Sequence, residues 1–305
     1  MKKNGAPSFN PYLAVVLAVV AASFSSIFTK LSNAPPLVIA FYRLLFTVLI
    51  ISPLALNAGG RRELRRIEPR DFILAVTSGA FLSLHFATWI TSLNYTSISS
   101  STVLVTMQPL FVITGGFLFL GEKLKKTALL GAAATLAGSV MIGINDFRIG
   151  GGALYGDLLA FSGAFWVALY VLIGRSLRMK LSLFTYVFIV YSASAILLLV
   201  FNLIAGTSLY PYPAGDWLCF LALAVIPTIF GHTVFNWALK YVKAAMVSVS
   251  ILGEPVGATI LAFFIFNQVP GVLQVSGGLI IIAGLFLFIK SSVDGAGRKP
   301  GQICS

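Results

Sequence analysis

The stretch SSTVLVTMQPLFVITGGFLFLGEKL, residues 100–124, is apolar for almost its whole length but contains Gln108 and Pro109 near its middle. A run of about 20 apolar residues is what an α-helix needs to cross the hydrocarbon core of a membrane. Proline removes a backbone hydrogen bond and kinks such a helix, which frees a carbonyl that needs another partner. The stretch therefore predicts a membrane-spanning helix that is interrupted halfway.

The composition of the whole chain is typical of a membrane protein. Of 305 residues, 58% are hydrophobic and 10% are charged, and the mean hydropathy is +0.95, whereas about 25% of the residues of a soluble domain are charged. Runs such as LAVVLAVVAA do not alternate apolar and polar residues, which argues against membrane β-strands. We predict an all-α protein with ten spans, at residues 11–32, 36–57, 71–93, 98–120, 127–144, 154–174, 182–205, 214–236, 244–267 and 270–290.

The net charge of +12 reflects membrane topology rather than a surface for nucleic acid. With the amino terminus inside the cell, all of the 21 Lys and Arg residues except Lys30, Arg43 and Arg148 fall in inside segments. This distribution obeys the positive-inside rule. With the short loops, it predicts a multi-pass protein of the cell (inner) membrane with both termini in the cytoplasm and no nucleic-acid partner. The segment RRELRRIEPR, residues 61–70, is predicted as a short cytoplasmic loop.

The opening stretch has a second copy later in the chain. A shift of 146 residues places Gln108 and Pro109 on Glu254 and Pro255 without a gap. We predict two five-span repeats at residues 9–145 and 153–290, a linker at 146–152 and a cytoplasmic tail at 291–305. Because five is odd, the repeats must cross the membrane in opposite senses, as in many secondary transporters. Four glycines that correspond between the repeats predict close helix contacts: Gly131, Gly138, Gly277 and Gly284.

Several motifs resemble those of the EamA-type branch of the drug/metabolite transporter superfamily. They are QPLFVITGGFLFLGEKL followed by GAAATLAG, the second copy GEPVGATILAFFIF followed by GGLIIIAG, and FYRLLF around Arg43. The second repeat departs from the first, with Asn267-Gln268 in place of Gly121-Glu122. The resemblance implies ten helices in two inverted repeats around a central cavity, alternating access, and export of small metabolites such as amino acids.

Glu254 is the acidic residue placed nearest the middle of a predicted span. An ionisable group at that depth costs at least about 2.5 kcal/mol to insert and is a functional hypothesis by default. Glu254 could bind substrate, accept and release a proton for coupling, or support the helix kink at Pro255. Pro109 and Pro255 are predicted to break their helices beside a cavity. The alternative is that these prolines only shape the packing of the helices.

Arg43 lies about 10 Å from the outer face of its span, at 1.5 Å per residue. It could hold a substrate carboxylate in bidentate fashion. It could instead lock helices together by binding carbonyls freed beside Pro109 or Pro255, or it could snorkel outward.

Two stripes of polar and aromatic residues occupy corresponding spans. The third span carries His85 and Trp89, and the eighth carries His232 and Asn236. Such residues suit a cavity for amphipathic or aromatic solutes, and the alternative is ordinary packing. The full set of predicted cavity residues is Arg43, His85, Trp89, Gln108, Trp166, Tyr170, His232, Asn236, Ser250 and Glu254.

The inventory of motifs argues against an enzyme. The sequence has no H-E-x-x-H pair, no phosphate-binding G-x-x-x-x-G-K-[ST] and no Cys/His cluster, so we predict no metal and no cofactor. We predict a secondary transporter of small metabolites, by default a monomer, whose partners are a small-molecule substrate and the lipid bilayer. Nucleotide-sugar, carboxylate or cationic drug transport by the same fold are the alternatives, and a channel-like facilitator is the alternative of another class.

Overall fold

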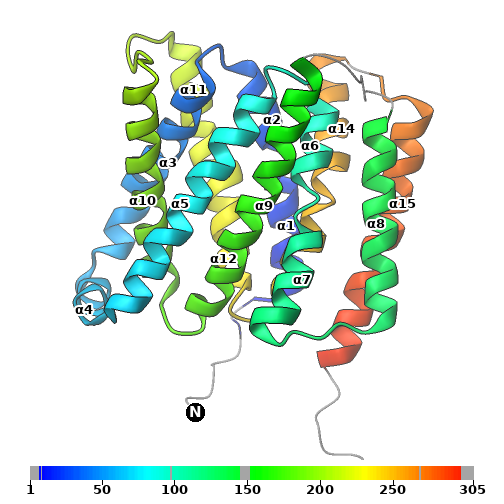
Figure 1. Ribbon diagram of the computed structural model, residues 1–305, viewed down its shortest axis with the longest axis horizontal. Helices are drawn as coiled ribbons and strands as arrows, with labels where there is room; N and C mark the ends of the chain where they lie inside the picture. Colours follow the sequence, from blue (N-terminus) through cyan, green and yellow to red (C-terminus); the bar gives the residue numbers. More distant parts are fainter. Residues whose placement is uncertain (1–6, 8, 97, 145–151, 268, 297–305) are drawn as a thin grey trace, which may run out of the picture.

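The computed structural model describes residues 7, 9–96, 98–144, 152–267 and 269–296. Within these residues the regular structure is entirely helical (Figure 1). Arg148, most of the predicted linker 146–152 and most of the predicted tail 291–305 lie outside the described residues. In chain order the helices are α1 (Pro11–Ala22), α2 (Phe24–Leu31), α3 (Pro36–Ala55), α4 (Ala58–Arg66), α5 (Pro69–Ser92), α6 (Ile98–Val105), α7 (Pro109–Leu120), α8 (Lys126–Ile144), α9 (Gly152–Arg178), α10 (Leu183–Ile204), α11 (Ala214–Leu223), the π-helix η1 (Ala224–Thr233), α12 (Val234–Ala238), α13 (Ala244–Ile251), α14 (Glu254–Phe266) and α15 (Val272–Ala296).

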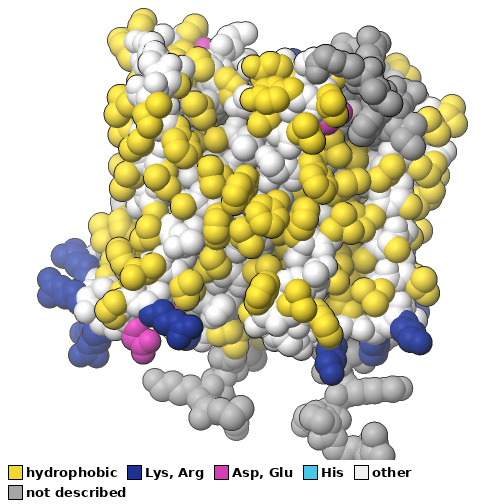
Figure 2. All heavy atoms as spheres, in the orientation of Figure 1, with side chains coloured by type: hydrophobic (Ala, Val, Ile, Leu, Met, Phe, Trp, Pro, Cys, Tyr) yellow, Lys and Arg dark blue, Asp and Glu magenta, His cyan; other side chains and the backbone are white. Residues whose placement is uncertain are grey.

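Ten apolar helical segments run between the two ends of the described structure. Nine of them are at least 18 residues long and apolar enough to cross a membrane, and the fifth, Lys126–Ile142, is a shorter apolar helix. Figure 2 shows the resulting surface, in which apolar side chains cover the wall and Lys and Arg side chains gather along one end. We call this the basic end. The predicted all-α membrane fold is confirmed.

Prolines fix the start of several spans. Pro11, Pro36, Pro69 and Pro109 are the first residues of α1, α3, α5 and α7, where the missing N–H has no helical partner to lose. Asn10 adds a cap to α1, because its side-chain oxygen accepts a hydrogen bond from the Tyr12 amide at 2.9 Å. The same residue that breaks a helix interior therefore begins these helices.

The packing pattern repeats when each span of the first half of the chain is exchanged with its counterpart in the second half. α5 of the third span packs on α9 of the sixth, and α1 of the first packs on η1 and α12 of the eighth. The fourth span packs on α9 through α6 and α7, and the ninth packs on α1 through α13 and α14. The pairs α3 with α10 and α8 with α15 are unchanged by the exchange. This is the packing of two inverted five-helix repeats.

The fourth and ninth spans are both interrupted at their prolines. A turn separates α6 from α7 before Pro109, and another separates α13 from α14 before Pro255. Each span also ends on a left-handed residue, Gly121 at φ 63° and Asn267 at φ 54°. Asn is one of the few residues with a side chain that adopts this conformation readily. The sequence difference between the repeats at this end therefore preserves the backbone geometry.

Glycines bring α8 and α15 into backbone contact at one edge of the bundle (Figure 1). A Cβ atom on Gly138 would lie 2.6 Å from the Gly277 carbonyl oxygen, and one on Gly277 would lie 2.6 Å from the Gly138 carbonyl oxygen. Gly131 and Gly284 are related in the same way at 2.9 Å. The close helix contacts predicted for these four glycines are confirmed.

Replacing Gly277 with Ala is expected to destabilise the protein by about 1–3 kcal/mol, the usual cost of overpacking, because the new methyl group would meet backbone atoms of α8. Gly278→Ala is the matched control, since a Cβ there would meet only Val256, at 3.9 Å. Thermal unfolding of the purified protein in detergent measures both variants. Equal melting temperatures for Gly277→Ala and Gly278→Ala would contradict the contact.

The segment 61–70, predicted as a loop, is mostly helical, and the prediction is wrong in this respect. α4 covers Ala58–Arg66 and α5 begins at Pro69. Asn57 caps α4 by accepting a hydrogen bond from the Gly60 amide at 2.8 Å. Arginines in the last turn favour a helix because they face its negative end. Four exposed arginines thus lie along one short helix at the basic end: Arg61, Arg62, Arg65 and Arg66.

Glu63 fastens α4 to the start of α10. Its carboxylate accepts hydrogen bonds from the Ser182 amide at 2.7 Å, the Ser182 hydroxyl at 2.5 Å and the Thr185 hydroxyl at 2.6 Å. Burial by itself would raise the pKa of Glu63, but these hydrogen bonds, with the charge of Arg178, lower it below its usual value.

A carboxyl group with a lowered folded-state pKa stabilises the fold above its unfolded pKa, and the contribution is lost as the pH falls. Glu63→Gln is therefore expected to lower the melting temperature by about 2 °C at pH 7, the size of shift that about 1 kcal/mol produces in a large domain. The difference from the parent should shrink as the pH falls below about 4.3, the unperturbed Glu pKa. Melting curves at pH 7 and pH 3.5 test this, and a difference that grows on acidification would contradict it.

Candidate functional site

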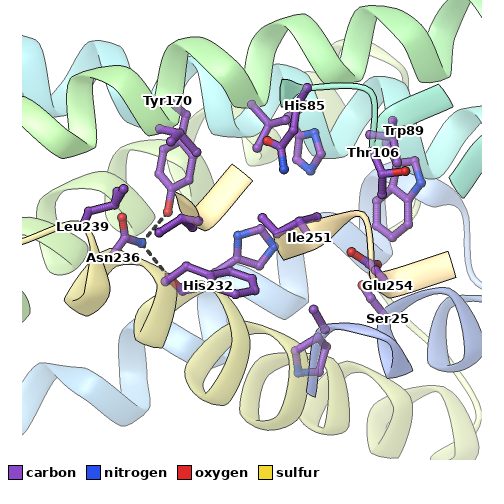
Figure 3. Close-up of a pocket in the computed structure, with 18 of the residues that line it drawn as sticks. Ser25, His85, Trp89, Thr106, Tyr170, His232, Asn236, Leu239, Ile251 and Glu254 are labelled. Atoms are coloured by element: carbon purple, nitrogen blue, oxygen red, sulfur yellow. Dashed lines mark hydrogen bonds between the residues drawn. The ribbon is translucent and has the colours of Figure 1, made fainter. Parts of the chain in front are cut away.

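A narrow cavity lies at the centre of the bundle, between the two interrupted spans. Both repeats contribute its lining, through α1, α2, α3, α5 and the turn after α6 in the first and through α9, η1 and α12–α14 in the second. Its free volume is about 40 Å³, which is room for only a few water molecules at about 10–15 Å³ each. Figure 3 shows polar and aromatic side chains converging on this space.

Eight of the ten residues predicted to line a cavity do so in the structure: Arg43, His85, Trp89, Gln108, Tyr170, His232, Asn236 and Glu254. Ser250 and Trp166 do not. The Ser250 hydroxyl donates to the Met246 carbonyl oxygen within α13 at 2.8 Å. Trp166 stacks on Phe81 with ring centroids 5.8 Å apart, so it packs α9 against α5.

Arg43 is held by hydroxyl groups from two other spans. Its side chain is fully buried, at 0% exposed. Nε donates to the Thr228 hydroxyl at 2.7 Å and Nη1 donates to the Ser25 hydroxyl at 2.8 Å. The guanidinium carbon lies 4.3 Å from the centre of the Phe86 ring, a cation–π contact. This placement rules out the snorkelling alternative, and the two bonded partners are hydroxyls rather than carbonyls freed by proline.

Glu254 shares the cavity with Arg43 without forming an ion pair with it. It is the first residue of α14, so its carboxylate lies at the end of a half-helix that favours negative charge. Glu254 and Ser25 both line the cavity (Figure 3). Within the described residues, no Lys, Arg or His nitrogen lies within 4.0 Å of that carboxylate. The cavity therefore holds one cation and one carboxyl group that are not directly paired.

Two histidines face each other across the cavity (Figure 3). The ring centroids of His85 and His232 are 6.4 Å apart. His85 Nδ1 lies 3.0 Å from the Gly163 carbonyl oxygen, which can only accept, so Nδ1 carries a proton and donates to it. His85 also stacks on Trp89 at an interplanar angle of 9°. Among the described residues, no three His, Cys, Asp or Glu side chains are grouped to hold a metal ion.

A hydrogen-bonded network forms the wall of the cavity nearest the basic end. The Asn236 amide nitrogen donates to the Tyr170 hydroxyl at 2.5 Å and to the His232 carbonyl oxygen at 2.8 Å (Figure 3). The Asn236 amide nitrogen also lies 3.4 Å from the Tyr191 hydroxyl, which in turn lies 3.1 Å from the Thr233 hydroxyl. The bond between Tyr170 and Asn236 joins α9 to α12.

Four cavity residues each have a buried polar atom with no hydrogen-bond partner among the described residues: Arg43 Nη2, Trp89 Nε1, Gln108 Oε1 and Asn236 Oδ1. A buried polar group without a partner costs about 1–3 kcal/mol. Two of these atoms are donors and two are acceptors. The cavity is therefore suited to a solute that both accepts and donates hydrogen bonds.

The π-helix of the eighth span was not expected from the sequence. The Thr228 hydroxyl donates to the Leu223 carbonyl oxygen, five residues earlier, at 2.7 Å. π-helical turns are rare in proteins, and those that occur frequently lie at functional sites. Here the π-helix carries Thr228, which binds Arg43, and His232, which faces His85. Pro227 within the span was a signal for an irregular helix.

A charged tie joins the two repeats beside the cavity, on the side of the basic end. Glu122 accepts hydrogen bonds from Arg175 Nε at 3.1 Å and from the Ala244 amide at 3.2 Å. Arg175 Nη1 also donates to the carbonyl oxygen of Leu239, which lines the cavity, at 2.5 Å. In the second repeat, the residue that corresponds to Glu122 is Gln268, which lies outside the described residues.

The family model of the EamA-like transporter family matches residues 10–144 and 154–290. A protein of Archaeoglobus fulgidus named as an uncharacterized transporter is 27% identical over 274 residues, which cover 90% of this chain and 94% of that protein. A pseudopaline exporter of Pseudomonas aeruginosa is 24% identical over 273 residues, 88% of this chain and 93% of that one. A crystal structure with 18% identity superposes with a TM-score of 0.76 and covers 93% of this chain and 98% of its own, a likeness of fold.

Proposed function

Because the chain belongs to the EamA-like transporter family, we propose that it carries a small zwitterionic metabolite, an amino acid or a related compound, through the central cavity. The observation behind this proposal is that Arg43 and Glu254 line one cavity without pairing with each other. Opposite charges held apart in a polar space suit a solute with both a carboxylate and an ammonium group. A solute with only one of these groups, carried by the same fold, is the alternative.

Each end of such a solute has a partner in the cavity. Arg43 Nη2, the guanidinium nitrogen left without a partner, donates to the solute carboxylate. The Glu254 carboxylate and Gln108 Oε1 accept hydrogen bonds from the ammonium group. The rings of His85 and Trp89 provide an apolar face for the solute side chain. In this role, Ser25 and Thr228 act as positioning residues because they hold the guanidinium in place.

Alternating access is the transport mechanism that we propose, and the two inverted repeats support it because such repeats can rock against each other around a central site. The breaks in the fourth and ninth spans lie at that site and allow each half-helix to move separately. A free volume of about 40 Å³ is too small for an amino acid, so the cavity must widen to admit the solute. In this scheme the tie between Glu122 and Arg175 opens when the cavity faces the basic end.

We assign the basic end to the cytoplasm and the protein to the inner membrane. Tyr12 near the start of α1 and Ser291 near the end of α15 line one pocket together with Lys125 and Lys243. The two ends of the described chain thus lie with the basic residues, which favours cytoplasmic termini by the positive-inside rule. Export is the proposed direction, by analogy with the relative named as an exporter.

Counterflow in proteoliposomes tests the proposed substrate class. A panel of radiolabelled amino acids is offered to vesicles preloaded with the same compound unlabelled, and each is competed with the matching amine without a carboxylate and the matching acid without an amine. We expect saturable exchange for at least one amino acid and competition from neither analogue. Equal competition by a one-charge analogue would favour the alternative class, and flux that does not saturate would indicate a channel.

A further inference from the structure

A second cavity lies at the basic end of the molecule, outside the central cavity. Its volume is about 280 Å³, close to the lower limit of about 300 Å³ for small-molecule sites. The start of α1, the start of α8, the end of α9, α13 and the end of α15 enclose it. Because these are the ends of spans, the cavity lies at the depth of the lipid headgroups. We call it the headgroup pocket.

The charges that line the headgroup pocket are all positive. Lys125, Arg175 and Lys243 contribute side chains, and no Asp or Glu is among its lining residues. Arg175 is paired with Glu122, whereas Lys243 donates to the carbonyl oxygen of Lys123, at 2.5 Å, and forms no ion pair within the described residues. Lys125 is exposed and forms no ion pair within the described part of the chain. Two lysine charges are therefore available to an anion.

Hydroxyl groups and apolar side chains complete the lining. Tyr12 and Tyr241 supply hydroxyls, while Phe288 is among the apolar residues of the wall. Ser291 and Ser292 also line the pocket, but the Ser291 hydroxyl lies 2.6 Å from that of Thr127 and the Ser292 hydroxyl donates to the Phe288 carbonyl oxygen at 2.8 Å. Hydroxyls donate to phosphate oxygens and lysine ammonium groups pair with their charge. A free anion in water does not need an apolar wall. The lining therefore matches a ligand that joins a phosphate to a hydrocarbon chain.

The headgroup pocket also lies at the foot of the surface formed by α8. Leu129 and Leu130, one turn beyond its lining residue Lys125, are 43% and 65% exposed, which places them against lipid acyl chains in a membrane. α8 and α15 form the outer edge of the bundle (Figure 1). A lipid whose chains lie along this edge reaches the pocket with its headgroup.

We propose that the headgroup pocket binds the phosphate headgroup of an anionic phospholipid of the inner leaflet. Basic pockets between spans on the cytoplasmic side are a recurrent form of lipid recognition. The bound lipid bridges the two repeats, because Lys125 belongs to the first and Lys243 belongs to the second. This site is separate from the central cavity, so the proposal does not depend on the identity of the transported solute.

Native mass spectrometry of the purified full-length protein tests the site. The protein in detergent is titrated with phosphatidylglycerol, phosphatidylcholine or water-soluble glycerol phosphate. The test variant is Lys125→Gln/Lys243→Gln. The matched control is Arg62→Gln/Arg65→Gln, which removes the same charge from the same end of the molecule but on α4, away from the pocket. Neutralising both lysines is expected to weaken phosphatidylglycerol binding about 30-fold, and the control is expected to leave it unchanged.

Each outcome decides the proposal. Preferential binding of phosphatidylglycerol that is lost in the lysine variant and kept in the arginine variant supports it. Glycerol phosphate binding as tightly as the lipid would show a soluble phosphate compound as the ligand and overturn the lipid assignment. Equal loss in both double variants, or none in either, would overturn the site. Lys125→Gln alone removes a side chain without a hydrogen-bond partner in the described structure, so an about fivefold smaller phosphatidylglycerol affinity in this variant supports the site even if the double variant unfolds.

Discussion

Exchange of the labelled solute falls at least about 100-fold when Arg43 is replaced with Lys. Arginine holds Ser25 and Thr228, lies over Phe86 and still has Nη2 for a solute carboxylate. A lysine ammonium lacks the planar set of donors of a guanidinium, so it cannot make all of these contacts at once. A hydrogen bond to a charged group contributes about 1.5–3 kcal/mol, and a loss of about 3 kcal/mol corresponds to roughly 100-fold. Initial rates of counterflow in proteoliposomes measure the effect.

Two controls separate transport from folding in this experiment. Arg62→Lys, on the exposed helix α4, should exchange solute at the parent rate. Thermal unfolding of Arg43→Lys in detergent shows whether the variant is folded, and a saturating solute should raise the melting temperature of the parent but not of this variant. A folded Arg43→Lys variant that exchanges within threefold of the parent would rule out a solute contact by Arg43.

Glu254→Gln is expected to uncouple transport from the proton gradient while preserving exchange. The Gln oxygen still accepts a hydrogen bond from an ammonium group, but Gln does not bind a proton. With one proton exchanged per solute, a gradient of one pH unit supports about tenfold accumulation in the parent. The variant should only equilibrate the solute, with a higher half-saturating concentration. Uptake of labelled solute into vesicles with and without an imposed pH gradient measures both quantities.

The matched control for this variant is Glu68→Gln, which alters an exposed carboxyl group at the basic end. It should accumulate solute as the parent does. If the parent itself only equilibrates solute in a pH gradient, the protein is a facilitator and Glu254 has a role in solute binding or in the helix break. If Glu254→Gln accumulates solute as well as the parent, proton coupling through Glu254 is contradicted.

The architecture could be predicted from the sequence because the membrane imposes strong rules on it. Apolar segments of span length and the alignment of Pro109 with Pro255 predicted the spans and the repeats. The distribution of Lys and Arg predicts which end faces the cytoplasm, and this stays a prediction. Arg43 and Glu254 were noticeable because a charged residue inside a span is costly and rare. These signals can be found in the sequence because they depend only on the type of each residue and on its depth in the membrane.

The contacts inside the bundle could not be predicted in the same way, because they join residues far apart in the sequence. Nothing local indicates that Ser25 and Thr228 hold Arg43, or that Glu63 fastens α4 to α10. Helical spacing also predicts on which face of a helix a residue lies, but it does not predict where along the helix axis the cavity is. Trp166 therefore packs on Phe81, although Tyr170, one turn later in α9, lines the cavity.

Side-specific labelling of the central cavity tests most directly whether it is the solute site of an alternating-access transporter. Thr106 is 1% exposed and lines the cavity (Figure 3). Thr106→Cys, in a background with Cys219 and Cys304 replaced by Ser, is treated with a membrane-impermeant maleimide from one side of the membrane or the other. We predict slow labelling from each side and at least about tenfold protection by saturating solute. Labelling that the solute does not change, or none from either side, would contradict the account.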